Sequence, residues 1–188
     1  MEHCNHIDFD NALDKAQAIR SALPSKLEKE KHGRQSYFRI GSGFDCETTI
    51  TPKRYAYVYI WQFSINSTVF TGRSCGSFEE FLKILDGTLQ LLHRKKVHGK
   101  IKNYPRLLVF DANMGYEWAF FKSVFGRVGI KALFSKDERH PLSISVGECL
   151  QFRECLGVFG YSLENVAEMH TKTQKLVEIG RASCRERV

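Results

Sequence analysis

The sequence has no apolar run near the about 18 residues that a membrane-spanning helix needs. Its N-terminus is polar, without the charged start and apolar stretch of a secretory signal. The six cysteines form no Cys-x-x-Cys pair and no disulfide-type spacing, so we expect reduced thiols. Internal repeats and low-complexity tracts are also lacking. We therefore expect an intracellular protein that is not secreted and has no membrane as a partner.

What the chain does have is enough apolar material for a folded domain. Its 188 residues are 43% hydrophobic and 12% aromatic, which is sufficient for one core of ordinary size. The net charge of +7 permits an anionic partner such as nucleic acid, because lysine and arginine neutralise phosphates. Runs of basic residues are also typical of an ordinary solvated face, so the charge alone does not identify the partner.

Two carboxylates stand one residue apart in a predicted strand. In an extended strand the side chains of Asp45 and Glu47 project to the same face, while Cys46 points the other way, into the sheet. Carboxylate oxygens are the ligands that Mg²⁺ and Mn²⁺ prefer, and paired carboxylates suit two-metal phosphodiester chemistry. The same Asp-x-Glu pattern also occurs at ordinary solvated strand ends, so further residues are needed to support a site.

A second group of polar residues follows a short apolar run that is suited to a buried strand, residues 106–111. Asn113, Tyr116 and Glu117 come directly after it and open a predicted helix. The first turn of such a helix lies near the carboxyl edge of the sheet, where α/β proteins place ligands. Glu117 is therefore a candidate third metal-facing carboxylate, although a glutamate in this position also complements the helix dipole.

The remaining pattern is a mixed α/β order. We predict a helix over residues 9–23, with Asp8 as a possible cap, and a second helix that starts at a Ser77-x-x-Glu80 capping box. Residues 25–36 are charged and have the composition of a linker or an exposed extension. The predicted strands cover residues 44–48, 55–65, 68–71, 106–111, 130–134, 142–146 and 150–153, and a short helix begins at Ser162.

Taken together, residues 44–48 and 113–117 resemble the first two exonuclease motifs of the protein-primed branch of family B DNA polymerases, the replicases of linear phages and plasmids. The resemblance implies a ribonuclease-H-like 3′–5′ proofreading exonuclease domain with a mixed central sheet and flanking helices. It makes Asp45, Glu47 and Glu117 the catalytic residues and the ligands of two divalent metal ions, Mg²⁺ or Mn²⁺. Glu117 stands where the family usually has aspartate.

The same resemblance supplies candidate DNA-binding residues. Thr48 matches the primer-strand contact of the first motif, and Asn113 and Tyr116 match the single-strand contacts of the second. Leu156 matches the leucine of the family's Ser/Thr-Leu contact to single-stranded DNA, with Cys155 in place of the hydroxyl residue.

The resemblance also implies that the chain is a fragment. Residues 171–177 resemble the lead-in to a third motif, Tyr-x-x-x-Asp, which does not follow, and residues 178–188 resemble a translated sequencing adapter. The expected organisation is an N-terminal helix and charged extension over residues 1–36, an incomplete exonuclease domain over residues 37–177, and a non-native tail over residues 178–188.

The implied function is hydrolysis of the 3′-terminal phosphodiester of DNA in the cytoplasm of a host cell, with weak or no activity for this chain alone. The implied partners are a single-stranded 3′ end or primer–template DNA and, for the full-length polymerase, a terminal protein primer. Two alternatives remain open: a stand-alone ribonuclease-H-like exonuclease, and a basic nucleic-acid-binding domain whose carboxylates are incidental.

Overall fold

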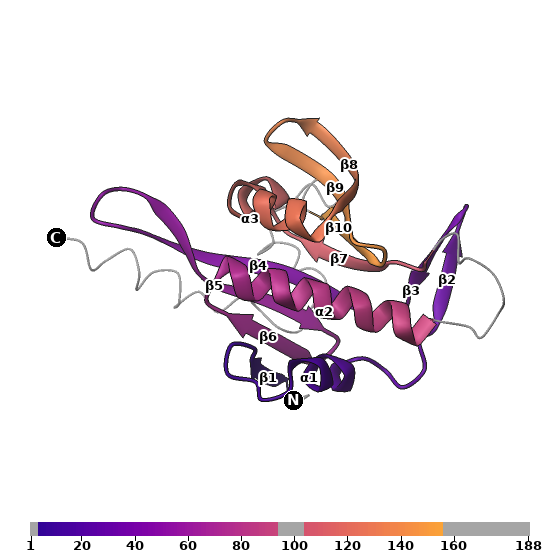
Figure 1. The fold of residues 1–188 in the computed structure, drawn as a ribbon. Helices are drawn as coiled ribbons and strands as arrows, with labels where there is room; N and C mark the ends of the chain where they lie inside the picture. The colour runs from indigo at the N-terminus through magenta and orange to yellow at the C-terminus, as the bar shows by residue number, and fades with distance from the viewer. Residues whose placement is uncertain (1–3, 94–103, 156–188) are drawn as a thin grey trace, which may run out of the picture. The chain divides into compact units, whose positions relative to one another are not determined.

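A mixed eight-stranded sheet forms the centre of the computed structural model, which describes residues 4–93 and 104–155. The α/β prediction with a mixed sheet and flanking helices is therefore confirmed. In spatial order the strands are β1 (Asn5–Asp8), β6 (Thr68–Gly72), β5 (Ala56–Ile65), β4 (Ser42–Ile50), β7 (Leu107–Asp111), β10 (Leu150–Glu154), β9 (His140–Val146) and β8 (Ile130–Asp137). The helices are α1 (Lys15–Ala22), α2 (Cys75–His93) and α3 (Met114–Val128), and β2 (Lys29–His32) pairs with β3 (Gln35–Phe38) in a separate small sheet (Figure 1).

The centre of the sheet combines an antiparallel meander with parallel strands. β4, β5 and β6 follow one another along the chain and pair antiparallel, with Asn66 in the turn between β5 and β6 at a positive φ of 50°. After α2, β7 pairs parallel to β4, and after α3 and the β8–β9 hairpin, β10 pairs parallel to β7. Parallel neighbours need a crossover connection, which α2 and the segment from α3 to β9 provide.

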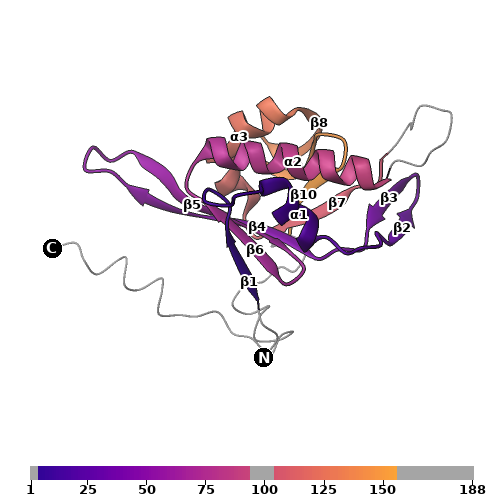
Figure 2. The same ribbon diagram turned by 60° about the horizontal axis from the view of Figure 1, so that its bottom comes forward.

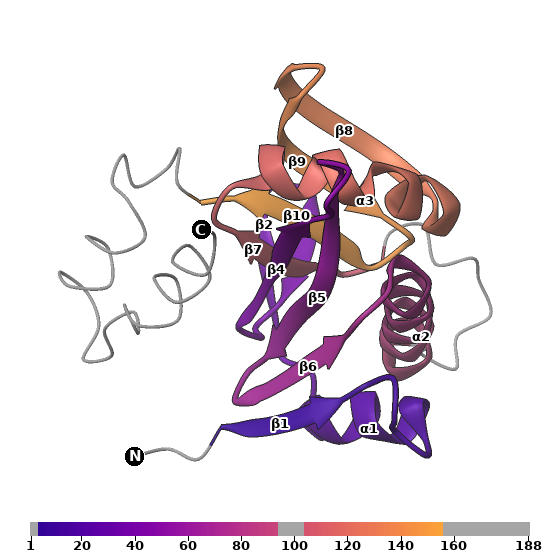
Figure 3. The same cartoon turned by 90° about the vertical axis from the view of Figure 1, so that its left-hand side faces the viewer.

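One face of the sheet carries the helices (Figure 3), and an aromatic core packs between the helices and this face. Phe44 of β4 stacks on Phe78 of α2 with ring centroids 4.5 Å apart, and meets Phe121 of α3 edge-on at 5.3 Å. These pairs fix which face of β4 points towards the helices. The other fully buried aromatic side chains are Phe9, Trp61, Phe63, Phe70, Phe81 and Phe152, together with Phe125 at 1% exposure.

The outer half of the β4–β5 hairpin projects beyond the rest of the sheet (Figures 1 and 2). β4 pairs with β5 as far as Ile50 and Ala56, whereas β7 pairs with β4 only at Gly43 and Phe44. The register between β4 and β5 shifts after Glu47. Bulges of this kind increase the local twist and re-aim side chains, and this one lies directly beside the Asp-x-Glu pair.

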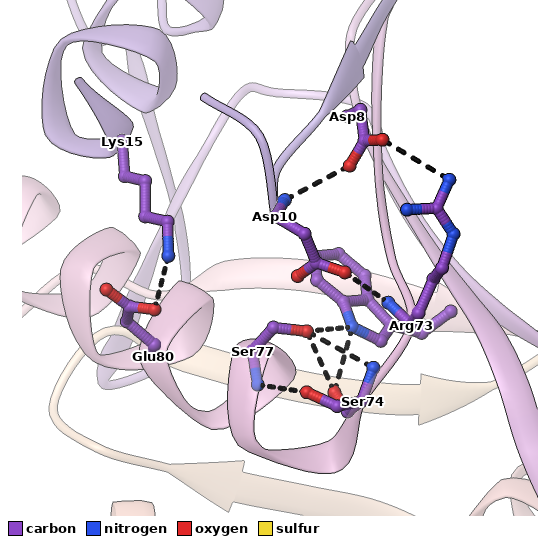
Figure 4. A network of polar contacts seen from close by, with 8 residues as sticks. Asp8, Asp10, Lys15, Arg73, Ser74, Ser77 and Glu80 are labelled. Atoms are coloured by element: carbon purple, nitrogen blue, oxygen red, sulfur yellow. Dashed lines mark hydrogen bonds and ion pairs between the residues drawn. The ribbon is translucent and has the colours of Figure 1, made fainter. Parts of the chain in front are cut away.

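The first helix is shorter than the pattern predicted. It begins at Lys15, because Asp14 is the N-cap and accepts the backbone N–H of Gln17 at 2.8 Å. Asp8 is not the cap. It ends β1, and its carboxylate accepts the backbone N–H of Asp10 at 3.2 Å and pairs with Arg73 at 3.4 Å (Figure 4).

The predicted capping box at the start of the second helix is wrong. α2 begins at Cys75, and the Ser74 hydroxyl accepts the backbone N–H of Ser77 at 3.0 Å. The Ser77 hydroxyl instead accepts the indole N–H of Trp61 at 3.0 Å, and Glu80 pairs with Lys15 of α1 at 2.7 Å (Figure 4). The Ser77 hydroxyl also accepts the backbone N–H of Ser74 at 3.4 Å, so the reciprocal bonds of a capping box form between Ser74 and Ser77, three residues before the predicted pair.

The N-terminal region is part of the main unit rather than an extension of it. β1 pairs parallel to β6, and residues expected to form a linker make the exposed β2–β3 hairpin. The compact unit spans Met1–Glu154, and a second unit spans Cys155–Val188. The structure thus has no division at residue 36. The helix predicted from Ser162, the third-motif lead-in and the tail over 178–188 lie outside the described residues.

Across residues 4–93 and 104–155, no helix is both long enough and apolar enough to cross a membrane. In the same ranges Cys4, Cys46, Cys75 and Cys149 are free thiols.

Candidate active site

The Asp-x-Glu pair lies on the face of β4 that points away from the helices. Asp45 and Glu47 are exposed, whereas Cys46 between them is only 5% exposed. Since Phe44 packs against the helices, strand alternation places Asp45 on the opposite face. The prediction that the two carboxylates project together and that the thiol points inward is confirmed.

The two motif segments meet at Thr48 and Tyr116, which are 68 residues apart in the chain. Their hydroxyl groups share a hydrogen bond, which links the β4 strand to the first turn of α3. Tyr116 is 41% exposed and its ring packs edge-on against Phe120 at 5.3 Å. One aromatic residue therefore contacts the Asp-x-Glu strand while keeping part of its ring open to solvent.

Glu117 is buried on the other side of β4 from the exposed pair. It is 4% exposed, and the Cys46 thiol donates towards its Oε1 across 4.0 Å. Asp45 still acts on it electrostatically, since burial first and then the charge of Asp45 raise the pKa of Glu117 to about 7. In the described part of the chain, no group of three or more His, Cys, Asp or Glu side chains is arranged to hold a metal ion.

Asp111 is a site residue that the sequence reasoning missed. It ends β7, lies opposite Phe44 in the register, and is only 2% exposed. Its Oδ1 accepts the backbone N–H of Asn113 at 2.9 Å, and its carboxyl group is hydrogen-bonded to that of Glu117. An acidic residue at the end of an otherwise apolar buried strand was the available signal.

Asp111 is the carboxyl group that stays protonated at neutral pH. Burial and then the charge of Glu117 raise the pKa of Asp111 to about 9, above the value of about 7 for Glu117. Asp111 therefore keeps its proton and donates it in the hydrogen bond to Glu117. If both groups were ionised, Glu117 Oε2 would have no hydrogen-bond partner among the described residues. The proton on Asp111 supplies this hydrogen bond.

Cys46 contributes a neutral thiol to this buried cluster. Burial is the largest cause of a raised thiol pKa, and the charges of Glu117 and Asp45 add to it. The thiol therefore remains protonated and acts as a weak donor rather than as a nucleophile or a thiolate ligand.

Of the other candidate DNA-binding residues, the structure describes Asn113 and Cys155. Asn113 is exposed at the N-cap of α3, where its side chain makes no capping hydrogen bond. Cys155 is half-buried directly after β10. Leu156 lies outside the described residues.

The donor chemistry of the site suits a hard divalent cation, but the three proposed ligands are not gathered around one point. Asp45 and Glu47 offer carboxylate oxygens that are accessible from solvent, which Mg²⁺ and Mn²⁺ favour. Glu117 is turned towards Cys46 and Asp111 instead. The residues that fit a metal most directly are therefore Asp45 and Glu47.

Comparison with known proteins adds no relative: no protein-family model, curated protein or solved structure matches this chain.

Proposed function

We propose that this chain is the 3′–5′ proofreading exonuclease part of a protein-primed family B DNA polymerase, with a ribonuclease-H-like core. The observation that carries the proposal is the hydrogen bond between Thr48 and Tyr116, because it joins the two segments that resemble exonuclease motifs. The antiparallel meander β4–β5–β6 followed by parallel β7 and β10 is also the kind of mixed sheet that this resemblance calls for.

In the proposed reaction the chain binds a frayed 3′ end next to the exposed carboxylates. Asp45 and Glu47 would hold the divalent ions, and Glu117 would have to turn away from Cys46 and Asp111 to join them. Bound ions of this kind lower the pKa of an attacking water and stabilise the departing 3′ oxygen. Tyr116 offers a partly open ring for a base, and the exposed Asn113 amide offers a donor for the strand.

Titration calorimetry with Mn²⁺ and Mg²⁺ tests this proposal. We expect measurable binding by the wild-type chain and none by an Asp45→Ala, Glu47→Ala double variant. Glu28→Ala, Glu30→Ala is a matched control, because these two glutamates are also exposed and two residues apart, and it should bind like wild type. Equal heats from all three proteins, or no heat from any of them, would contradict a metal site at the Asp-x-Glu pair.

Two observations favour a second candidate, a basic nucleic-acid-binding domain without catalysis. In the described residues the carboxylates do not form a three-membered metal cluster, and the net charge is +7. This candidate predicts that binding to single strands survives chelation and does not change in Asp45→Ala.

A further inference from the structure

A groove of about 680 Å³ lies between α3 and the turn that joins β8 to β9. From α3 it is lined by Asn113, Tyr116 and Lys122, among others, and from the turn by Glu138, Arg139 and His140. Only Asn113 and Tyr116 belong to the site described above. The other four residues bring a charge pattern that the proposed exonuclease chemistry does not use.

The wall of the groove on the hairpin side is held in place by the Asp137 carboxylate. It accepts the backbone N–H of Arg139 at 2.8 Å and of His140 at 3.0 Å, and it also bonds the His140 ring at 2.8 Å. These bonds close the turn from both its backbone and its side chain.

The turn is also fixed against the helix. The indole N–H of Trp118 donates to the backbone oxygen of Glu138 at 3.3 Å. Gly115 lets the two elements approach, because a Cβ at this position would lie 3.1 Å from the Arg139 oxygen and 3.0 Å from the His140 ring. The groove is therefore shaped by contacts between two elements rather than by a loose loop.

The charge in the groove favours an anion. Lys122 and Arg139 are both exposed, and neither has an ion-pair partner among residues 4–93 and 104–155. The Lys122 ammonium is positioned 5.6 Å from the centre of the Trp118 ring. Against these two cations stands one carboxylate, Glu138, whose pairing with either cation is not observed in the described residues.

The solvent-exposed ring of Tyr116 favours one class of anion, single-stranded nucleic acid. Single-stranded nucleic acid is held by cations that contact phosphates and by aromatic side chains that stack on bases. The groove offers both, and it does so next to Thr48, which the Tyr116 hydroxyl contacts on the strand of Asp45 and Glu47.

We propose that this groove binds single-stranded DNA, with phosphates at Arg139 and Lys122 and a base against Tyr116. The inference rests on the proposed function, since Tyr116 and Asn113 serve both, and it adds the β8–β9 turn as a second wall for the bound strand. It assigns a role to a hairpin whose first strand, β8, is exposed along its whole length.

The test measures fluorescence anisotropy of a labelled oligo(dT) in EDTA with the full chain. We expect Arg139→Gln and Lys122→Gln each to weaken binding about 3- to 10-fold, and each to reduce the slope of log K against log salt by roughly 0.7. Lys136→Gln is the matched control, since Lys136 lies on β8 outside the groove lining and is exposed. It should change affinity less than about 2-fold, and thermal melts should show that all three variants fold like wild type.

Two results would overturn the groove as a binding site: equal effects of Arg139→Gln, Lys122→Gln and Lys136→Gln, or no oligonucleotide binding by the wild type. Because the assay contains no metal, its outcome is separate from the metal titration. If the groove variants bind DNA more weakly but Asp45 and Glu47 bind no metal, the groove is supported as a DNA-binding site and the proposed nuclease function is contradicted. If Asp45 and Glu47 bind metal but the groove variants bind DNA like wild type, the nuclease function is supported and the groove is contradicted as a DNA-binding site.

Discussion

Asp111 and Glu117 place two carboxyl groups side by side in the interior. Ionising the second one next to the charge of the first costs additional free energy there. Burial is the largest cause that raises the pKa of each group, to about 9 for Asp111 and about 7 for Glu117; the charge of Glu117 adds to the shift of Asp111, and the charge of Asp45 adds to that of Glu117. Each folded-state pKa is then higher than that of the unfolded chain. The folded chain holds protons that the unfolded chain has released, so the stability that these groups contribute is present at low pH and lost as pH rises.

We therefore expect the free energy of unfolding of the metal-free chain to fall between pH 5.5 and 8. The limiting slope is about 1.4 kcal/mol per pH unit for each group whose pKa differs between the two states. Urea unfolding in EDTA at several pH values measures it. Asp111→Asn should flatten the dependence, because the amide still donates a hydrogen bond to Glu117 but does not titrate.

Asp137 provides the control for this pH experiment. Hydrogen bonds from the Arg139 backbone and the His140 side chain lower the pKa of Asp137, so its contribution is lost only as pH falls through the acidic range. Asp137→Asn should therefore leave the slope above pH 5.5 as in wild type. A stability that stays constant or rises from pH 5.5 to 8 in the wild type would contradict the raised pKa values of Asp111 and Glu117.

At the residue scale, the sequence predicted the outward pair and named Glu117, but missed its buried partner Asp111. Strand alternation alone determines that Asp45 and Glu47 share a face, so this part needed no tertiary information. Whether Glu117 turns towards that pair or towards Cys46 depends on how α3 packs against the sheet. For the same reason, Asp111 reads in the sequence as a polar residue at a strand end rather than as a buried acid.

At the scale of elements, Asp86 of α2 holds the turn between β9 and β10. Its Oδ1 accepts the backbone N–H groups of Glu148 at 3.0 Å and Cys149 at 2.7 Å, and the residue is 8% exposed. Gly147 opens the turn at a φ of +61°, and a Cβ there would lie 2.6 Å from the carboxyl carbon of Asp86. Helix and turn thus fit only with aspartate on one side and glycine on the other.

Asp86→Ala should lower the free energy of unfolding by roughly 2–4 kcal/mol, because the buried N–H of Cys149 and the partly buried N–H of Glu148 lose a charged acceptor. Asp86→Asn keeps an oxygen acceptor of the same shape and should lose less. Thermal and urea unfolding at pH 7 measure both. Equal losses of stability in the two variants would contradict the role of Asp86 in holding the turn between β9 and β10. So would a loss below about 0.5 kcal/mol in Asp86→Ala, which is the range of ordinary surface substitutions.

Elements with strong periodicity were predictable and elements defined by their partners were not. The alternation in residues 55–65 predicted β5 almost to its ends, and the apolar face of α2 predicted its burial. β1 was missed because four polar or mixed residues become a strand only through pairing with β6. The start of α2 was misplaced because Ser74 and Ser77 cap each other's backbone N–H groups, three residues before the Ser77-x-x-Glu80 pattern that was read as the cap.

At the scale of the whole molecule, the two candidate functions make opposite predictions about how carboxylates and metal affect DNA binding. A chain with a net charge of +7 attracts DNA in either case, so affinity by itself does not separate them. If the exposed pair lies where a phosphodiester binds, Asp45 and Glu47 repel the strand when no cation is present. If the carboxylates are incidental, the strand binds elsewhere and is indifferent to them.

We expect Asp45→Ala, Glu47→Ala to bind oligo(dT) about 3- to 10-fold more tightly than wild type in EDTA at low salt, because two negative charges next to a phosphate are removed. Adding Mn²⁺ should tighten binding by the wild type by a similar factor and leave the double variant unchanged, since only the wild type then gains a cation at that point. Glu28→Ala, Glu30→Ala changes the net charge equally, so it measures how much of the gain comes from charge alone. Similar affinities of the two double variants, with no response of the wild type to Mn²⁺, would favour the non-catalytic domain and count against the exonuclease.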